Sequence, residues 1–102
     1  MPSYILSPDA QQDLKEIARY TYKRWGKDSF DAYRNGLRKT FNSIGKGNAL
    51  KRPFLNAFPN LFVTKYRYHF IFYIHENAQK PVIIGVIHEQ QDIISRLNKR
   101  LS

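Results

Sequence analysis

Apolar and polar positions follow one spacing in the first half of this chain of 102 residues and a different spacing in the second half. In the first half, apolar side chains recur every three or four residues, as they do on one face of an amphipathic helix. The first stripe consists of Ala10, Leu14, Ile17, Thr21 and Trp25. The second consists of Phe30, Tyr33, Leu37, Phe41 and Ile44. From residue 61 onward, aromatic and β-branched residues instead form short dense runs, which are typical of strands.

Residues with known preferences for helix ends bracket both stripes. Ser7 can cap the first helix with its side-chain oxygen, and Pro8 suits the first helical position because no backbone N–H is needed there. Gly26 ends this helix directly after Trp25, which we expect to pack between the helix end and the following loop. Asp28 can cap the second helix. Because the connection is short, the two helices should form an antiparallel hairpin.

The remaining segments predict strands on either side of a long loop. Residues 4–6 can form a short first strand. Residues 45–60 are rich in Gly, Pro and Asn, which indicates an irregular loop. Three strands are then expected near 61–66, 68–75 and 82–88, and a polar turn separates the last two.

The last element expected is a short basic helix over residues 92–100. The fold class predicted is α+β, with an N-terminal strand, an antiparallel helical hairpin packed on an antiparallel β-sheet, and a short C-terminal helix. The length predicts a single domain over residues 1–102.

Alternation within the longest aromatic strand divides its side chains between two faces of the sheet. We expect the continuous apolar set to face the helices; it comprises Tyr68, Phe70, Phe72 and Ile74. The mixed set should face solvent, the final helix or a partner; it comprises Arg67, His69, Ile71, Tyr73 and His75.

The charge of the chain is strongly unbalanced. It carries 17 basic and 8 acidic residues, a net charge of +9. No acidic residue occurs between Ala32 and His75, where eight Lys and Arg residues fall. A field of one sign attracts polyanions or an acidic protein partner, although a small soluble domain can also carry excess charge without a partner.

Several functional classes lack their usual sequence features. The chain has no cysteine, so neither a disulfide nor a thiolate metal site is expected. The N-terminus lacks the pattern of a signal peptide, and no apolar run approaches the length that spans a bilayer. We therefore expect a soluble cytoplasmic protein without a membrane segment.

Candidate catalytic groups are few. His88 and Asp92 partly match a zinc-protease motif, but the second histidine is missing, so no metal is expected. Asp92 should cap the last helix, and His88 should end a strand with local hydrogen bonds. His69 and His75 share a strand face, but six residues of strand separate them by roughly 20 Å, which is too far to serve one phosphate. We expect no catalytic residue and no cofactor.

The order of these elements resembles the ParE branch of the ParE/RelE toxin family over nearly the whole chain. The matching features are the Ser7-Pro8-x-Ala10 opening with Asp13-Leu14 and Ile17, the helix end at Tyr20 or Tyr22 with Trp25-Gly26, Tyr33, the aromatic strand Tyr68 to Tyr73, and Val82 to His88 closed by Asp92. The resemblance implies the toxin of a type II toxin–antitoxin pair. Such a toxin binds and poisons DNA gyrase, assembles with a ParD-like antitoxin, and acts in plasmid stabilisation.

One departure from the family pattern concerns Gln90-Gln91, where many relatives carry an arginine before the aspartate. The nuclease branch of the family is similar to RelE and places basic residues and a late Tyr or His around the scissile phosphate. Here no tyrosine follows Tyr73. Two alternatives stay open: a RelE-type ribosome-dependent mRNA endoribonuclease, with Lys51, Arg52, Lys65 and Arg67 as phosphate contacts, and a simple nucleic-acid-binding module.

A binding toxin would act through contact surfaces. The candidates for contact with the target or the antitoxin are Lys65, Arg67, Tyr73, Arg96, Lys99 and Arg100. Charge at these positions can meet gyrase or, indirectly, the DNA that gyrase holds. An acidic antitoxin segment should order itself along the aromatic strands and the helical hairpin.

Overall fold

The computed structural model of the protein describes residues 3–48 and 51–101. The elements follow one another as β1 (Ile5–Leu6), α1 (Pro8–Trp25), α2 (Lys27–Gly45), β2 (Arg52–Leu55), β3 (Phe58–Tyr66), β4 (His69–Ile74), β5 (Val82–His88) and α3 (Ile93–Leu101). The five strands form one sheet in the order β1-β5-β4-β3-β2. β1 pairs with β5 in parallel, and the other neighbours are antiparallel. The predicted α+β class is confirmed.

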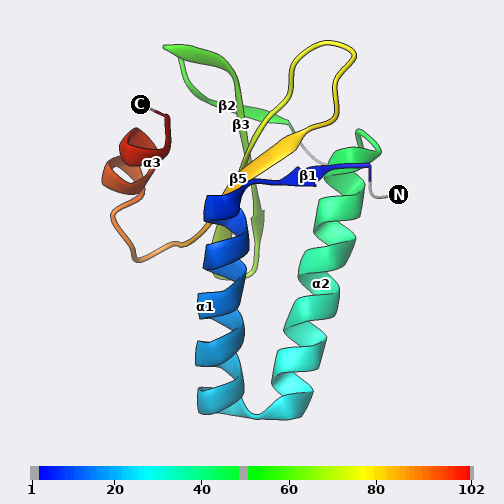
Figure 1. Ribbon diagram of the computed structural model, residues 1–102, viewed down its shortest axis with the longest axis vertical. Coiled ribbons are helices and arrows are strands. Elements are labelled where there is room, and N and C mark those ends of the chain that lie inside the picture. Colours follow the sequence, from blue (N-terminus) through cyan, green and yellow to red (C-terminus); the bar gives the residue numbers. More distant parts are fainter. Residues whose placement is uncertain (1–2, 49–50, 102) are drawn as a thin grey trace.

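The sheet is covered on both faces. The α1–α2 hairpin packs on one face, where the first core cluster contains Leu37, Phe41 and Ile44 from α2 together with Ile71 and Ile83 from the sheet. α3 packs on the other face, where Leu97 meets a second cluster that includes Leu61 and Phe72. Figure 1 shows the hairpin and α3 as separate bodies on either side of the strands. Among the described residues, no helix is both long and apolar enough to cross a membrane.

The ends of the hairpin helices follow the sequence signals with one exception. The Ser7 hydroxyl accepts the Ala10 N–H at 3.1 Å, and Pro8 opens α1, as predicted. Gly26 ends α1 with a φ of 88°, a left-handed value that glycine adopts without steric cost. α2 begins at the very next residue, so Asp28 lies inside the first turn and does not cap the helix as predicted. Its negative charge still suits the positive end of the helix dipole.

The expectation for the two faces of the aromatic strand was wrong. Ile71 and Tyr73 belong to the cluster under the helical hairpin, whereas Phe70 and Phe72 belong to the cluster under α3. Both faces of β4 are covered, so apolar residues occupy both sets of alternating positions. Alternation then separates the two faces without telling which helix covers which face.

Part of the predicted loop at residues 45–60 is regular structure. Arg52–Leu55 forms β2, and β3 begins at Phe58, three residues before the predicted start. β2 is an edge strand, where Pro53 can sit because one backbone side has no neighbour to bond. Ala49 and Leu50 of this predicted loop lie outside the described residues.

A bulge in β5 ties three elements together. Phe72 pairs with Gly85 and Tyr73 pairs with Ile83, so Ile84 is an extra residue on β5. Beside the bulge, Asp13 of α1 accepts the Val86 N–H at 2.9 Å. A side chain at Gly85 would meet the Arg100 guanidinium at 2.6 Å, so the missing side chain leaves room for the arginine.

Candidate functional site

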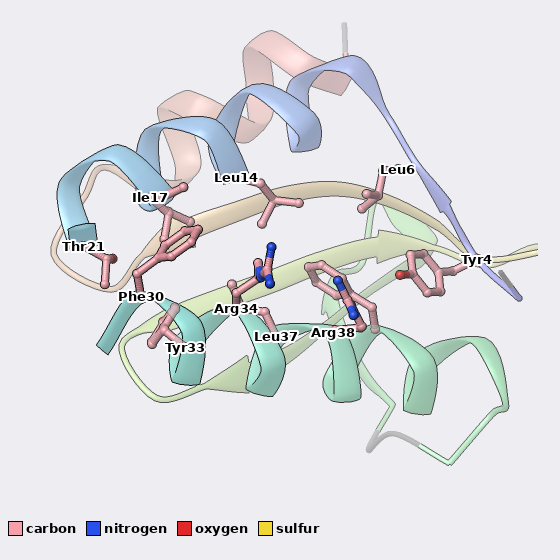
Figure 2. Close-up of a pocket in the computed structure, with 12 residues that line it drawn as sticks. Tyr4, Leu6, Leu14, Ile17, Thr21, Phe30, Tyr33, Arg34, Leu37 and Arg38 are labelled. Atoms are coloured by element: carbon pink, nitrogen blue, oxygen red, sulfur yellow. The ribbon is translucent and has the colours of Figure 1, made fainter. Parts of the chain in front are cut away.

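The hairpin carries an open apolar groove between α1, α2 and β1, which we call the hairpin groove. Its volume is about 290 Å³. The residues that line it are Tyr4, Leu6, Leu14, Ile17, Ala18, Thr21, Phe30, Tyr33, Arg34, Leu37, Arg38 and Phe41. Figure 2 shows Leu14 and Ile17 of α1 facing the side chains of α2 across the groove, with Tyr4 and Leu6 at the β1 end. The helical stripes that form the core thus also leave an apolar surface open.

Two exposed arginines give the hairpin groove its charge. Arg34 and Arg38 lie one helical turn apart on α2 and extend into the opening between the helices (Figure 2). Arg34 also lies over the Phe30 ring, with 5.5 Å between the guanidinium carbon and the ring centroid. No acidic residue is among the described residues that line the groove. An apolar surface with two cations suits an amphipathic segment that carries acidic side chains.

A second cavity lies where the closed end of the hairpin meets the β3–β4 turn, the end of β5 and α3; we call it the histidine pocket. Its volume is about 510 Å³. The residues that line it are Asp13, Glu16, Ile17, Tyr20, Thr21, Trp25, Ser29, Ala32, Tyr33, Arg67, Tyr68, His69, Val86, His88, Gln91 and Arg96. Unlike the groove, it draws its lining from segments far apart in sequence.

A chain of four rings forms one wall of the histidine pocket. His69 and His88 are cross-strand partners on β4 and β5, and their ring centroids are 5.1 Å apart. Tyr68 stacks on His88 at 6.4 Å, and Tyr33 of α2 meets His69 at 5.5 Å with its hydroxyl on the His69 Nδ1. The rings therefore connect the buried part of the hairpin to the exposed β3–β4 turn.

The protonation of this cluster follows from its burial. Burial lowers the pKa of His69 to about 4, and the neighbouring His88 shifts it in the same direction. His69 is therefore neutral near pH 7. Burial also raises the pKa of Tyr33, so its hydroxyl keeps its proton. On His88, Nδ1 accepts the Gln90 N–H at 3.1 Å. A general base works best with a pKa close to the operating pH, and His69 lies well below it.

A buried ion pair anchors α3 beside the histidine pocket. Arg100 forms two hydrogen bonds with the Asp13 carboxylate, at 2.6 and 2.8 Å, and a third with the Ile84 carbonyl at 3.2 Å. Both side chains are largely buried, at 13% exposed for Arg100 and 7% for Asp13. The pair fixes α3 against α1 and β5, and it neutralises the Asp13 charge.

Comparisons with known proteins identify the family of the chain. A family model described as the ParE toxin of the type II toxin–antitoxin system parDE matches residues 4–93. The chain belongs to the ParE toxin family. It is 28% identical to Toxin ParE of Escherichia coli over 101 residues, which cover 99% of this chain and 98% of that relative. It is also 28% identical to Toxin ParE1 of Mycobacterium tuberculosis over 90 residues, 88% of this chain and 92% of the relative.

Membership of the ParE family makes this chain the toxin component of a type II toxin–antitoxin system, as the resemblance implied. The match to the ParE family model ends at residue 93, where α3 begins. The helix that carries Arg96 and Arg100 therefore lies almost wholly beyond the matched segment.

The residues predicted to have structural roles divide into confirmed and corrected cases. Asp92 accepts the Ser95 N–H at 3.2 Å at the start of α3, and His88 makes local hydrogen bonds with Gln90 and Gln91, as predicted. Trp25 does not pack between the helix end and the loop, because 63% of it is exposed. Gly26 allows α2 to start at once, so no loop is left to cover the ring.

The predicted contact residues do not form one surface. Arg67 and Arg96 both line the histidine pocket. Lys65 is bound to Glu89 at 2.6 Å, and Lys99 is exposed on α3. Two further candidates are corrected by their burial.

Tyr73 and Arg100 are unavailable as contact surface in this fold. Tyr73 is only 1% exposed, because its side chain points from β4 into the core cluster under the hairpin. Arg100 is occupied by Asp13. Both assignments failed because exposure was inferred from residue type, whereas both faces of the sheet are covered.

Sequence reasoning missed the arginines of the groove and the Asp13 anchor. Arg34 and Arg38 are spaced by four residues beside the stripe of α2, which places them on one flank of that stripe. Asp13 lies three residues after Ala10 and four before Ile17, so it falls on the buried face of α1. A carboxylate on such a face requires a partner, and that requirement was the available signal.

Proposed function

We propose that this toxin inhibits DNA gyrase by binding it and that a ParD-like antitoxin neutralises it by occupying the hairpin groove. The observation that carries the proposal is the groove itself: an open apolar surface with Arg34 and Arg38 inside it and no acidic residue in its described lining. The two proteins would form a hetero-oligomer.

The chemistry of the groove favours a helical antitoxin segment. Amphipathic helices bind apolar grooves through side chains on one face, and acidic residues on the helix would pair with the two arginines. Because the apolar part of such a contact is not screened, the complex should weaken as salt rises but persist at high salt.

The gyrase part of the proposal rests on family membership and on the electrostatics of the molecule. The net charge is +9, Arg67 and Arg96 are exposed cations that line the histidine pocket, and Lys99 is exposed on α3. They can contact gyrase or, indirectly, the DNA that gyrase holds. The low pKa of His69 favours inhibition by binding over proton-transfer catalysis at neutral pH.

The test of the antitoxin site is a variant that fills the groove. Ala18→Trp adds a large apolar side chain to the groove lining without cutting into the core. It should weaken binding of a cognate ParD-like antitoxin by at least about tenfold, because a filled groove excludes the incoming anchor residues. Toxicity should remain. Asn35→Trp, on an exposed position of α2 outside both cavities, is the matched control. Equal affinity for both variants would contradict the groove assignment.

The test of the target compares two reactions. Purified toxin should block supercoiling by DNA gyrase and leave ribosome-bound mRNA intact, and induced expression should give the SOS response and filamentation. Translation arrest without gyrase inhibition would contradict the proposal.

A ribosome-dependent endoribonuclease remains the second candidate, because the structure brings His69 and His88 together with Arg67 and Arg96 in one pocket. Such an enzyme would cleave mRNA, and His88→Ala would reduce the rate by a factor on the order of 10² to 10⁴ in a folded protein. If the toxin acts by binding, neither the parent protein nor the His88→Ala variant should cleave mRNA.

A further inference from the structure

Three of the exposed aromatic rings of the molecule line the histidine pocket. Tyr20, Trp25 and Tyr68 are 64%, 63% and 59% exposed, and all three line this one pocket. They come from the end of α1 and from the β3–β4 turn, so exposed rings reach the pocket from two separate segments. Tyr68 stacks on His88 on one side, and Arg24 lies over the Trp25 ring. These rings are not part of the core of this chain, since none of them belongs to either buried cluster.

The same pocket carries two arginines that make no ion pair with any described residue. Ion pairs among the described residues join Lys27 to Asp31, Lys65 to Glu89 and Arg100 to Asp13, among others. Arg67 and Arg96 take part in none of these. Asp13 is neutralised by Arg100, so Glu16 is the acidic lining residue that remains to oppose them. The described lining therefore has an excess of positive charge.

The backbone at Arg67 gives a further indication. Arg67 has a φ of 52°, a left-handed conformation that costs energy for any residue except glycine. Its guanidinium carbon lies 5.7 Å from the centroid of the Tyr66 ring. Strained non-glycine positions of this kind cluster at binding sites, because there the side chain has a use that a glycine could not meet.

We propose that the histidine pocket binds an unpaired nucleotide of a single-stranded nucleic acid, with the base stacked on Trp25 or Tyr68 and the phosphates held by Arg67 and Arg96. Aromatic faces and cations along one cleft are the two elements of single-strand recognition, because every base has a face that can stack and every nucleotide carries a phosphate. A base in an intact duplex is already stacked and cannot enter the pocket. The site does not depend on gyrase being the target of the toxin.

The single tryptophan of the chain provides a direct probe of the proposal. Ten-nucleotide oligothymidylate should quench Trp25 fluorescence, and a fluorescent label on the oligonucleotide should give a parallel rise in anisotropy. A duplex of the same length should bind at least about tenfold more weakly at equal salt. The ribonucleotide strand is measured in parallel, and tighter binding of either strand supports the site and identifies the preferred sugar. Binding that neither changes Trp25 fluorescence nor weakens in Tyr68→Ala would overturn the proposal, because the strand would then lie elsewhere.

Matched variants separate this site from general attraction to a basic protein. Tyr68→Ala should weaken single-strand binding about tenfold, whereas Tyr22→Ala, which removes a ring of similar exposure outside the pocket, should not. Arg67→Gly and Arg96→Ala should each lower the slope of log affinity against log salt by about 0.7, the value for one phosphate contact on a single strand. Lys39→Ala, on an exposed position of α2 outside the pocket lining, tests the non-specific part of the binding.

Equal losses in Lys39→Ala and Arg67→Gly would overturn the proposal, as would duplex binding as tight as single-strand binding. Gyrase supercoiling measured with the same variants keeps the two proposals apart. Loss of single-strand binding in Tyr68→Ala with gyrase inhibition intact would support the nucleotide site and place the gyrase contact elsewhere.

Discussion

The hairpin groove and the histidine pocket are assembled in opposite ways. The groove takes all of its lining from residues 4–41, a continuous part of the chain, and it is apolar apart from two arginines at its opening. The pocket takes its lining from residues 13–96 and combines tyrosines, histidines, arginines and carboxylates. The groove therefore depends on helix periodicity and packing, and the pocket depends on polar contacts between distant elements. Four perturbations test this difference.

The largest effect is expected from Arg100→Ala, which breaks the anchor of α3 beside the pocket. Removal of one partner leaves Asp13 as a buried, unpaired charge, a change that typically costs about 3–5 kcal/mol in the free energy of unfolding. Hydrogen exchange should show α3 losing protection while the hairpin keeps it. Lys99→Ala, on an exposed position of the same helix, should stay within about 0.5 kcal/mol. The double variant that combines Asp13→Leu with Arg100→Met removes both charges. If it regains stability relative to Arg100→Ala, the stability lost in Arg100→Ala comes from the unpaired charge.

A slightly smaller loss of stability is expected when a core side chain beneath the groove is truncated. Leu37→Ala removes a side chain that is 4% exposed and packs between the hairpin and the sheet, so unfolding should become easier by about 2–5 kcal/mol. Chemical denaturation measures this change, with Asn35→Ala as the exposed control on the same helix. A loss well under about 1 kcal/mol would mean that the stripe of α2 does not carry the packing.

The contribution of the pocket to stability should depend on pH, whereas that of the groove should not. The pKa of His69 is lowered to about 4, whereas an unfolded histidine titrates near 6.5. Between these values the unfolded state binds more protons, so the contribution of His69 is complete above pH 6.5 and is lost as the pH falls toward 4. Because part of the ring is open to solvent, we expect a change of about 1 kcal/mol. Denaturation of His69→Gln across the same range should lack this component, and an unchanged profile would contradict the assignment.

The smallest effect is expected at the β3–β4 turn. Arg67→Gly relieves a left-handed backbone, which is worth about 1–2 kcal/mol, but it also makes the unfolded chain more flexible. The net change in stability should lie between about zero and 1 kcal/mol in favour of the variant. Thermal unfolding measures it, and Arg67→Ala should be no more stable than the parent because alanine keeps the strain. Clear destabilisation of Arg67→Gly would show that the guanidinium holds the turn together.

Local signals decided the part of the molecule that forms the groove. Ser7, Pro8 and Gly26 bound α1 where the sequence placed its ends. The α2 stripe from Tyr33 to Ile44 packs in the core between the hairpin and the sheet, as expected. These features are determined within one or two helical turns, so the sequence contains their causes. The resemblance to ParE rests on the same ordered signals, and it extended the prediction to the toxin family.

Only the tertiary structure decided which face of β4 lies under the hairpin, because two covered faces both carry apolar residues. The meeting of His69 with His88 depends on the register of β4 against β5, which no local pattern fixes. The burial of Tyr73 and the pairing of Arg100 with Asp13 across 87 positions depend in the same way on distant elements packing together. The sequence by itself therefore determined the helices and their ends, whereas packing over long sequence distances decided the pocket.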